Sequence, residues 1–541
     1  MDKRDLEIMA PAGNFECLHA AIQGGADSVY FGVGNLNMRS HSANNFTPDD
    51  LPDIVRICRE NSVKTYLTLN IVLYQEDLPA MREALDAALR AGVDAVIASD
   101  MAAITYSRSI GLEVHASTQL NVSNAEALRF YAGFADVIVL ARELNLRQVK
   151  EIHETIVREG IRGPKGELVR IEMFAHGAFC MAVSGKCYLS LQTYGASANR
   201  CACYQLCRRG YEVTDLETGN KLNIDNKYIM SPKDLCTIEF MDRIVDAGVK
   251  VFKIEGRARS AEYVRKTTAC YRKAADAVCD GTYSPELASR LKDELSEVFN
   301  RGFWDGYYQG ARLGEWSEVY GSHATRKKIY CGKVTNWFDR IGVAEILVES
   351  EPLHPGDDVL IIGETTGVLE MTVSEVRVDL KNVSEAAKGA LCSIPVAFPE
   401  GERRPGGKKI RRGDRLYIWR STEQVSPGAL PAASAGYFNR QHRQAASSGG
   451  ISRQHRRSMA GGKTLTSSYP TIPMMSRSDS IPSFYISTGS ASTISLHAKG
   501  FLRFSAPTWT AEAPAIIISM TSAALATPPQ PMTGIEQAWL T

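Results

Sequence analysis

Short apolar runs alternate with amphipathic segments over the first 300 residues of the chain. Each run is seven to ten residues long and rich in Val, Ile and Leu, which is typical of a buried β-strand. The segments between most runs place apolar residues three or four positions apart, as in a helix with one buried face. The predicted strands are residues 6–12, 27–33, 64–73, 94–100, 113–122, 136–144, 169–177 and 250–258.

Regular alternation of strands and helices predicts a parallel sheet. Eight such units within about 280 residues favour a closed, TIM-like (β/α)8 barrel over an open sheet. We therefore expect an α/β barrel domain over residues 1–300. Only the seventh strand lacks a helix directly after it, because a Cys-rich insertion (178–236) follows instead.

Polar residues recur at the carboxyl ends of the predicted strands. Taken singly, each is more often a surface or capping residue than a functional one. In a TIM-like barrel, however, these ends form one rim, where functional side chains gather around one cavity. The residues at this position are Asn70, Asp100, His115, Ser117, Gln119, Arg142, Glu143, Glu172, His176, Lys253, Glu255 and Arg257.

The chain changes character after the barrel. Residues 301–327 are predicted to be a linker, and residues 328–420 contain short alternating strands split by Gly- and Pro-containing turns, which predicts a small antiparallel β-barrel. Residues 421–541 are of low complexity, rich in Ser, Thr, Ala and Pro. Two interpretations of this tail stay open: a disordered segment, or the product of a reading-frame error.

Charge supports this division. The whole chain has a net charge of +1, but residues 426–541 carry +6 and residues 1–425 carry −5. No apolar run reaches the length of a membrane span, and the charged N-terminus does not fit a secretory signal. We therefore expect a cytoplasmic protein without a membrane partner.

The cysteines are unevenly distributed. Of twelve, five lie between residues 180 and 207, namely Cys180, Cys187, Cys201, Cys203 and Cys207, and Cys236 follows. Disulfides are uncommon in the cytosol, so metal or cluster ligation is the leading interpretation, with buried free thiols as the alternative. No Cys-x2-Cys pair occurs, and the irregular spacing suits an iron–sulfur cluster better than a zinc knuckle.

Several long motifs resemble one known family. They are EMFAHGAFCMAVSGKCYLS (172–190), CYQLCRRGY (203–211), SPKDLC (231–236) and FKIEGRARSAEYV (252–264). Together with LEIMAPAGN near the N-terminus, they make the chain similar to the collagenase-like peptidase family U32, particularly its tRNA hydroxylation branch. The resemblance extends over residues 5 to 420.

The resemblance implies both a fold and an activity. Better understood members of the family are oxygen-independent hydroxylases of tRNA wobble uridine, ribosomal RNA cytidine or the ubiquinone ring. They carry a 4Fe–4S iron–sulfur cluster, and the matching motifs imply Cys180, Cys187, Cys203 and Cys236 as its ligands, with Cys207 in reserve. The RNA-modifying members use prephenate as the hydroxyl source. The expected function is therefore tRNA hydroxylation, with tRNA, a small anionic co-substrate and a homo- or hetero-oligomeric paralogue as partners.

Two alternatives stay open beside tRNA hydroxylation. One is the peptidase of the family's traditional label, with Cys180 or Cys187 as nucleophile and His176 or His115 as base. The chain has neither an H-E-x-x-H nor a G-x-S-x-G motif, which disfavours a zinc or serine protease. The other alternative is hydroxylation of a quinone precursor.

Roles can be assigned to the rim residues on chemical grounds. His115, His176 and Glu255 are candidate proton acceptors, whereas Arg142, Lys253, Arg257 and Arg39 suit anions such as carboxylates or RNA phosphate. Asn70, Gln119 and Glu172 are further candidates for substrate binding. A structural ion-pair ladder is the alternative for Lys253, Glu255 and Arg257. RNA binding finds local support in basic patches at 208–209, 326–328 and 402–415, although the folded part is acidic overall.

Overall fold

The computed structural model describes residues 3–38, 46–212, 214, 228, 230–311, 313–318, 321–398 and 410–422, with three short strands beyond them. Contacts divide the chain into two compact units, Met1–Pro431 and Ala432–Thr541.

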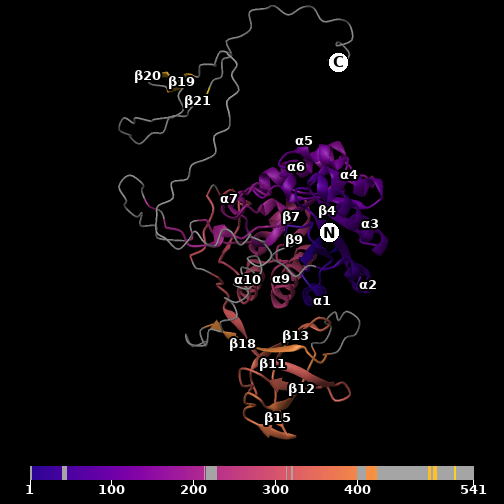
Figure 1. Ribbon diagram of the computed structural model, residues 1–541, viewed down its shortest axis with the longest axis vertical. Helices are drawn as coiled ribbons and strands as arrows, with labels where there is room; N and C mark the ends of the chain where they lie inside the picture. Colours follow the sequence, from indigo (N-terminus) through magenta and orange to yellow (C-terminus); the bar gives the residue numbers. More distant parts are fainter. Residues whose placement is uncertain are drawn as a thin grey trace, which may run out of the picture. The chain divides into compact units, whose positions relative to one another are not determined.

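Eight parallel strands close into a barrel, which confirms the predicted TIM-like fold (Figure 1). Neighbouring strands pair in sequence order, and β9 closes the ring by pairing with both β1 and β7. All eight agree with the predicted runs. The strands are β1 (Glu7–Pro11), β2 (Ser28–Phe31), β3 (Lys64–Leu69), β4 (Ala95–Ala98), β5 (Glu113–Ala116), β6 (Val137–Val139), β7 (Arg170–Ala178) and β9 (Val249–Ile254).

Helices cover the outside of the barrel (Figure 1). Their starts are encoded locally, because Asn14 and Asn145 accept hydrogen bonds from backbone N–H groups of the first turns of α1 and α6. The helices are α1 (Phe15–Gln23), α2 (Leu51–Glu60), α3 (Leu78–Ala91), α4 (Met101–Ser109), α5 (Ala125–Ala132), α6 (Leu146–Glu159), α8 (Met241–Asp246), α9 (Ala261–Asp280) and α10 (Pro285–Ser296).

Four charged residues of alternating sign stand at the amino ends of four strands of the barrel. Glu7, Lys64, Glu113 and Arg170 are the first residues of β1, β3, β5 and β7. Arg170 Nη1 lies 2.9 Å from Glu7 Oε2, and Lys64 Nζ lies 3.8 Å from the same oxygen. Glu113 pairs with Lys165. We call these four residues the basal charge ring.

The segment predicted as a linker, residues 301–327, packs on the barrel over much of its length. Within it, β10 (Phe303–Trp304) pairs with β8 (Asp234–Cys236), which itself runs antiparallel to β7. Tyr308 is buried, and its hydroxyl donates a 2.7 Å hydrogen bond to the carbonyl of Phe174. This segment therefore buttresses the end of β7 from which the Cys-rich insertion leaves.

An antiparallel sheet follows, as the alternating strands predicted. Its described pairings run from β14 at one end to β16 at the other, so they form a sheet around its own apolar core and do not show the expected closed barrel. The strands are β11 (Arg326–Phe338), β12 (Val343–Val348), β13 (Asp358–Gly363), β14 (Gly367–Thr372), β15 (Val376–Val378), β16 (Lys381–Val383), β17 (Leu391–Pro395) and β18 (Arg415–Ser421).

The sheet is joined to the barrel through α1. The side-chain amide of Gln23 donates to the Thr366 carbonyl at 3.0 Å and accepts from the Val368 N–H at 2.9 Å. This paired contact fixes β14 against the outer face of the barrel.

The second unit contains three short antiparallel strands, β19 (Tyr485–Thr488), β20 (Ser492–Ser495) and β21 (Ile517–Ile518). Apart from these, the tail predicted to be of low complexity lies outside the described residues. In the part of the chain that is described, no helix is both long and apolar enough to span a bilayer.

Candidate functional site

The segment after β7 lies over the carboxyl-terminal mouth of the barrel. We call residues 179–212, which include the short helix α7 (Leu189–Tyr194), the cysteine lobe. Its contacts reach loops that follow three different strands. Cys201 Sγ lies 2.8 Å from the carbonyl of Asn35 after β2, and Arg200 Nη1 lies 2.5 Å from Asp77 after β3. Asn121 after β5 donates to the carbonyl of Ser184 at 3.0 Å.

Four thiols of the lobe lie near one another. Burial is the main cause of the raised pKa values of Cys187 and Cys207, and the neighbouring thiols raise both further. For Cys187 these neighbours are Cys180 and Cys203, and for Cys207 they are Cys180, Cys203 and Cys187. The pKa of Cys207 reaches about 11 even though Arg208 lowers it. The sequence-predicted Cys180, Cys187 and Cys203 are thus brought together, with the reserve residue Cys207 as the fourth.

Cys236 lies elsewhere. It is buried in β8, where it pairs with His176 of β7, and its Sγ lies 4.0 Å from the hydroxyl of Tyr271 on α9. Burial raises its pKa to about 11, and the lobe thiols are not among the main causes. The structure therefore places Cys207, rather than Cys236, beside the other three predicted ligands. Across the described residues, no three Cys, His, Asp or Glu side chains stand at metal-ligand geometry.

An excess of positive charge lies behind the thiols. Buried Asp234 faces two guanidinium groups, since Arg301 lies 3.2 Å and Arg259 3.9 Å from its carboxylate oxygens. Arg208 extends from the lobe and donates to the carbonyls of Phe179, at 2.6 Å, and Pro232. Burial and the charge of Arg301 lower the pKa values of Arg208 and Arg259, whereas Asp234 raises both. One carboxylate thus serves three arginines, which leaves this region suited to an anionic group.

Inside the barrel, Glu172 and Lys253 form a buried ion pair. Lys253 Nζ donates a 2.7 Å hydrogen bond to Glu172 Oε1, and the ammonium also lies over the rings of Tyr30 and Phe174. The other Glu172 oxygen is buried without a hydrogen-bond partner and lies 3.9 Å from His115 Nδ1. His115 Nε2 in turn lies 3.4 Å from Glu113 of the basal charge ring. These residues form a polar column along the barrel axis.

Arg142 stands at the upper end of this column. Its guanidinium lies 4.0 Å from the centroid of the Phe174 ring, so Arg142 and Lys253 approach the same aromatic side chain. Its Nε is buried without a hydrogen-bond partner, and no ion pair to Arg142 is formed among the described residues. Among those predicted anion-binding residues that the structure describes, Arg142 is therefore the one with a half-buried, uncompensated charge.

Other predicted rim residues make structural contacts. Arg257 Nη1 donates to Asn37 at 2.9 Å and to Thr68 at 2.7 Å, and Asn70 accepts from the Met38 N–H at 3.4 Å. These contacts hold the loop after β2 against β3. Arg39, the remaining predicted anion-binding residue, lies outside the described residues.

Gln119 and Glu255 stay near the mouth of the barrel. Gln119 accepts a 2.5 Å hydrogen bond from Ser117, and a Cβ at Gly185 of the lobe would stand 3.2 Å from the Gln119 side chain. Gln119 is therefore a contact point between the lobe and the loop after β5. Glu255 is half-buried and accepts from Tyr30 at 3.3 Å.

The structure corrects the expected position of His176. A register shift between Phe174 and His176 turns this histidine out of the barrel toward α9, where its ring packs near Tyr263, Tyr271 and Phe303. Burial lowers the pKa of His176 to about 4, so it is neutral at physiological pH. The position of His176 at the carboxyl end of a strand had predicted a side chain at the rim, and the bulge turns it away from there.

Sequence reasoning missed the residues that support the lobe. Phe179, Trp304 and Tyr307 form a cluster of edge-on aromatic rings with centroids 5.1–5.9 Å apart. The Arg259–Arg301–Asp234 cluster was also missed, because its members come from three distant segments. The only sequence signal was the Arg208–Arg209 pair, which resembled a surface patch although Arg208 is largely buried.

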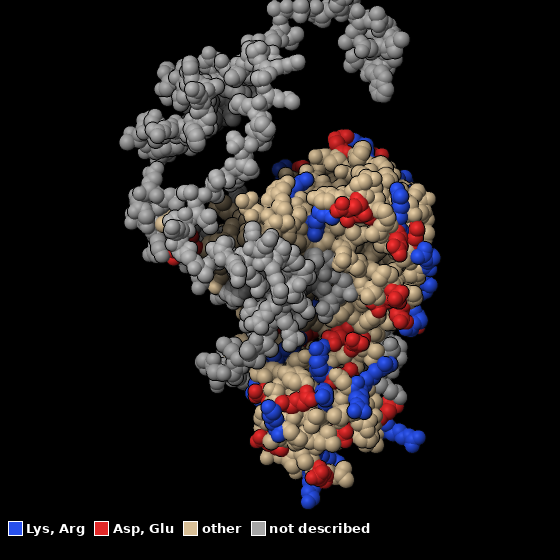
Figure 2. Space-filling view, in the orientation of Figure 1, with Lys and Arg blue, Asp and Glu red and all other residues tan. Residues whose placement is uncertain are grey.

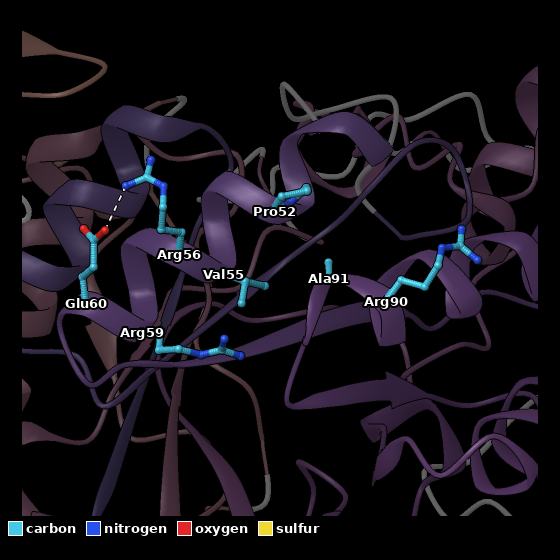
Figure 3. A pocket seen from close by; sticks show the side chains of 7 residues that line it. All are labelled: Pro52, Val55, Arg56, Arg59, Glu60, Arg90 and Ala91. Atoms are coloured by element: carbon cyan, nitrogen blue, oxygen red, sulfur yellow. Dashed lines mark hydrogen bonds and ion pairs between the residues drawn. The ribbon is translucent and has the colours of Figure 1, made fainter.

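A cavity of about 410 Å³ lies away from this site, between α2 and α3 (Figure 3). Arg56, Arg59 and Arg90 contribute to its lining. Arg59 and Arg90 lie in the last turns of these helices, where cations offset the helix dipole, and Arg56 is paired with Glu60. The arginines that line the cavity are therefore explained by their structural roles in the two helices.

Comparison with known proteins decides the family. Residues 13–318 match the profile of peptidase family U32. The chain belongs to peptidase family U32. It is 58% identical over 424 residues to a protein named collagenase from Porphyromonas gingivalis, covering 78% of this chain and all of that protein.

Other members of family U32 are named for RNA modification. The chain is 31% identical over 393 residues to tRNA hydroxylation protein P1 of Bacillus subtilis, covering 71% of this chain and 90% of that protein. It is 34% identical over 383 residues to the 23S rRNA 5-hydroxycytidine C2501 synthase of Escherichia coli, covering 68% of this chain and 55% of that protein. Family relatives thus carry enzyme names of two kinds, peptidase and RNA hydroxylase.

Proposed function

We propose that this U32 member is an iron–sulfur-dependent RNA hydroxylase that acts on tRNA, with wobble uridine as the modified base. The observation that carries the proposal is the group of four thiols beside a surplus of partly buried arginines over the mouth of the barrel. Relatives named for tRNA and ribosomal RNA hydroxylation cover most of the same chain.

The donor set suits a 4Fe–4S cluster in its chemistry. Thiolates are the usual ligands of such clusters, and a cluster held by four thiolates is anionic. Arg208, Arg259 and Arg301 exceed Asp234 in charge, so the surroundings of the thiols favour an anion. We propose Cys180, Cys187, Cys203 and Cys207 as ligands, with Cys236 as the alternative to Cys207. When bound, the cluster would supply one-electron chemistry at the mouth.

The barrel residues would bind and orient the hydroxyl donor. A small carboxylate such as prephenate would place an anionic group on Arg142, whose charge is not compensated by a described residue. The Lys253–Glu172 pair lies just below, so Lys253 can present a proton at its Nζ while Glu172 holds the ammonium in place. Glu255, hydrogen-bonded to Tyr30, is the remaining candidate proton acceptor at this level.

Peptidase activity is the second candidate, because a relative named collagenase is 58% identical to the chain. A cysteine protease needs a thiol activated by a histidine. Within the described residues, neither predicted histidine is hydrogen-bonded to a thiol: His115 lies between Glu113 and Glu172, and His176 contacts the Tyr271 hydroxyl. The geometry therefore favours the hydroxylase.

Nucleoside mass spectrometry tests the proposal. tRNA from a strain lacking this gene should have lost 5-hydroxyuridine derivatives, and the wild-type gene should restore them. A Cys180→Ser gene should not restore them. If deletion leaves these nucleosides unchanged while gelatin cleavage by the purified protein survives metal removal, the peptidase is correct.

The fourth ligand can be assigned with matched variants. Cys207→Ser should lose bound iron as Cys203→Ser does, whereas Cys236→Ser should retain it, with Cys331→Ser in the separate sheet as a control. Iron loss in Cys236→Ser but not in Cys207→Ser would instead establish Cys236, the residue that the motifs imply, as the fourth ligand.

A further inference from the structure

The cysteine lobe has an unusual composition for this protein. From Phe179 to Tyr211 the sequence has no Asp or Glu, although residues 1–425 carry a net charge of −5. The same segment contains four basic residues and four tyrosines. They are Lys186, Arg200, Arg208 and Arg209, and Tyr188, Tyr194, Tyr204 and Tyr211.

Large apolar side chains are concentrated on the outside of the lobe. Of the seventeen that are exposed among the described residues, five belong to it: Met181, Val183, Tyr188, Leu191 and Tyr194. Tyr188 is 67% exposed and Tyr194 45%. Exposed apolar side chains gathered in one short segment favour an interaction site over an ordinary solvent-facing surface.

The tyrosines lie beside the thiols. Tyr188 directly follows Cys187, and Tyr204 directly follows Cys203. The rings of Tyr194 and Tyr204 have centroids 5.0 Å apart, and Arg209 donates a 2.9 Å hydrogen bond to the Tyr194 hydroxyl. The Arg209 guanidinium also lies 5.7 Å from the centroid of that ring. An aromatic platform with an exposed cation thus adjoins the proposed reaction site.

We propose that the cysteine lobe is the RNA-docking surface and that its exposed tyrosines stack on unpaired bases next to the thiols. The inference rests on the proposed function and specifies its substrate as the unpaired loop of a folded RNA. The sequence of the lobe contains one carboxylate, Glu212, at its last position. Aromatic rings and cations with so few carboxylates are the combination that binds single-stranded nucleic acid. A paired base is already stacked on both faces, so only an unpaired base can use the platform.

The alternative docking site for RNA is the rest of the protein surface. Lys and Arg are interspersed with Asp and Glu over the face of the barrel and sheet shown in Figure 2, so no single basic field is visible there. On the lobe, Arg200 is paired with Asp77, and Arg208 is partly buried and donates to backbone carbonyls, which leaves Lys186 and Arg209 as its exposed cations. Docking should therefore rely on stacking and depend only weakly on salt, with a logarithmic slope of about −1.4 for two phosphate contacts.

Fluorescence anisotropy of the full-length protein with a labelled RNA hairpin tests the docking surface. The hairpin carries a uridine-containing unpaired loop, and a blunt duplex of the same stem is the reference. Tyr188→Ala and Tyr194→Ala should each weaken hairpin binding by about 5-fold or more, while Tyr194→Phe retains it. The matched control is Phe130→Ala, which removes an aromatic ring, 61% exposed, from α5. It should change binding less than about 2-fold.

Each other outcome overturns the inference. Hairpin binding that is unchanged in Tyr188→Ala and Tyr194→Ala places docking elsewhere, and a loss confined to Phe338→Ala would place it on the sheet. Equal binding of hairpin and duplex contradicts stacking. Lobe variants that lose gelatin binding but keep RNA binding would make the lobe a protein-docking surface. In each case nucleoside analysis of the same variants reports separately whether the proposed hydroxylation stands.

Discussion

The two ends of the barrel use charge differently. At the amino-terminal end, Glu7, Lys64, Glu113 and Arg170 alternate in sign around the barrel. At the carboxyl-terminal end, three arginines share Asp234, and Arg142 pairs with no described residue. Removing one partner of a compensated buried pair is costly, whereas a surplus of partly buried charge is relieved when an anion binds beside it. We therefore expect substitutions at the amino-terminal end to change stability most and substitutions at the carboxyl-terminal end to change binding most.

The largest expected effect on stability is in the basal charge ring. Arg170→Met should lower the free energy of unfolding by about 3 kcal/mol, because it removes the 2.9 Å partner of the buried carboxylate of Glu7. Chemical denaturation measures the change. Lys64→Met is the matched control and should cost less than about 1 kcal/mol, since Lys64 is half exposed and lies 3.8 Å from Glu7. Equal losses of stability in the two variants would show that Arg170 contributes no more to the ring than Lys64 does.

A buried group between the two ends makes stability depend on pH. His176 has a pKa of about 4 in the folded protein, because burial disfavours its charged form. The unfolded chain protonates it near pH 6.5, so stability is lost as the pH falls from about 6.5 to 4, by up to roughly 3 kcal/mol. Denaturation midpoints measured at several pH values should fall less steeply for His176→Gln. Parallel curves for the variant and the wild type would show that another group is responsible.

The ion pair on the barrel axis should show strong coupling. Glu172→Gln leaves the ammonium of Lys253 buried without the negative charge that lies 2.7 Å from it and should cost about 2 kcal/mol. Glu172→Gln combined with Lys253→Met should recover part of that loss. A double-mutant cycle measures the coupling. If the free-energy effects of the two substitutions simply add, the two side chains do not interact.

The smallest effect on stability is expected at the upper end, where the effect on function should be large. Arg142→Gln removes only contacts with aromatic rings, so it should change stability by less than about 1 kcal/mol. If Arg142 binds the hydroxyl donor as proposed, tRNA hydroxylation by the variant should fall by at least about 10-fold, because a charged hydrogen bond would be lost. Arg56→Gln, which alters an exposed pair on α2, should leave hydroxylation unchanged. A stable Arg142→Gln protein with full activity would remove Arg142 from the site.

The sequence predicted the barrel well because its strands are continuous apolar runs between amphipathic helices. Strand position also singled out Glu172, Lys253 and Arg142, although Glu172 and Lys253 lie inside the barrel rather than at its rim. It did not predict the outward turn of His176, which depends on a bulge in β7. Nor did it predict the arginines around Asp234, because residues 234, 259 and 301 meet only after the barrel closes.

The choice between Cys207 and Cys236 as the fourth proposed ligand shows the same limit of prediction from the sequence. Motif similarity favoured Cys236, but the packing of β8 against β7 places that thiol beneath Tyr271. The effect of the lobe thiols on one another became visible only in three dimensions. Spacing along the chain identified the cysteines of the lobe as candidates and could not order them in space.

Iron and acid-labile sulfide analysis of the full-length protein, purified without air, tests the central claim most directly. The account predicts a brown protein with about four irons per chain. It also predicts that both colour and iron disappear in Cys180→Ser, Cys187→Ser and Cys203→Ser. A colourless, iron-free wild-type protein that still hydroxylates tRNA would contradict it.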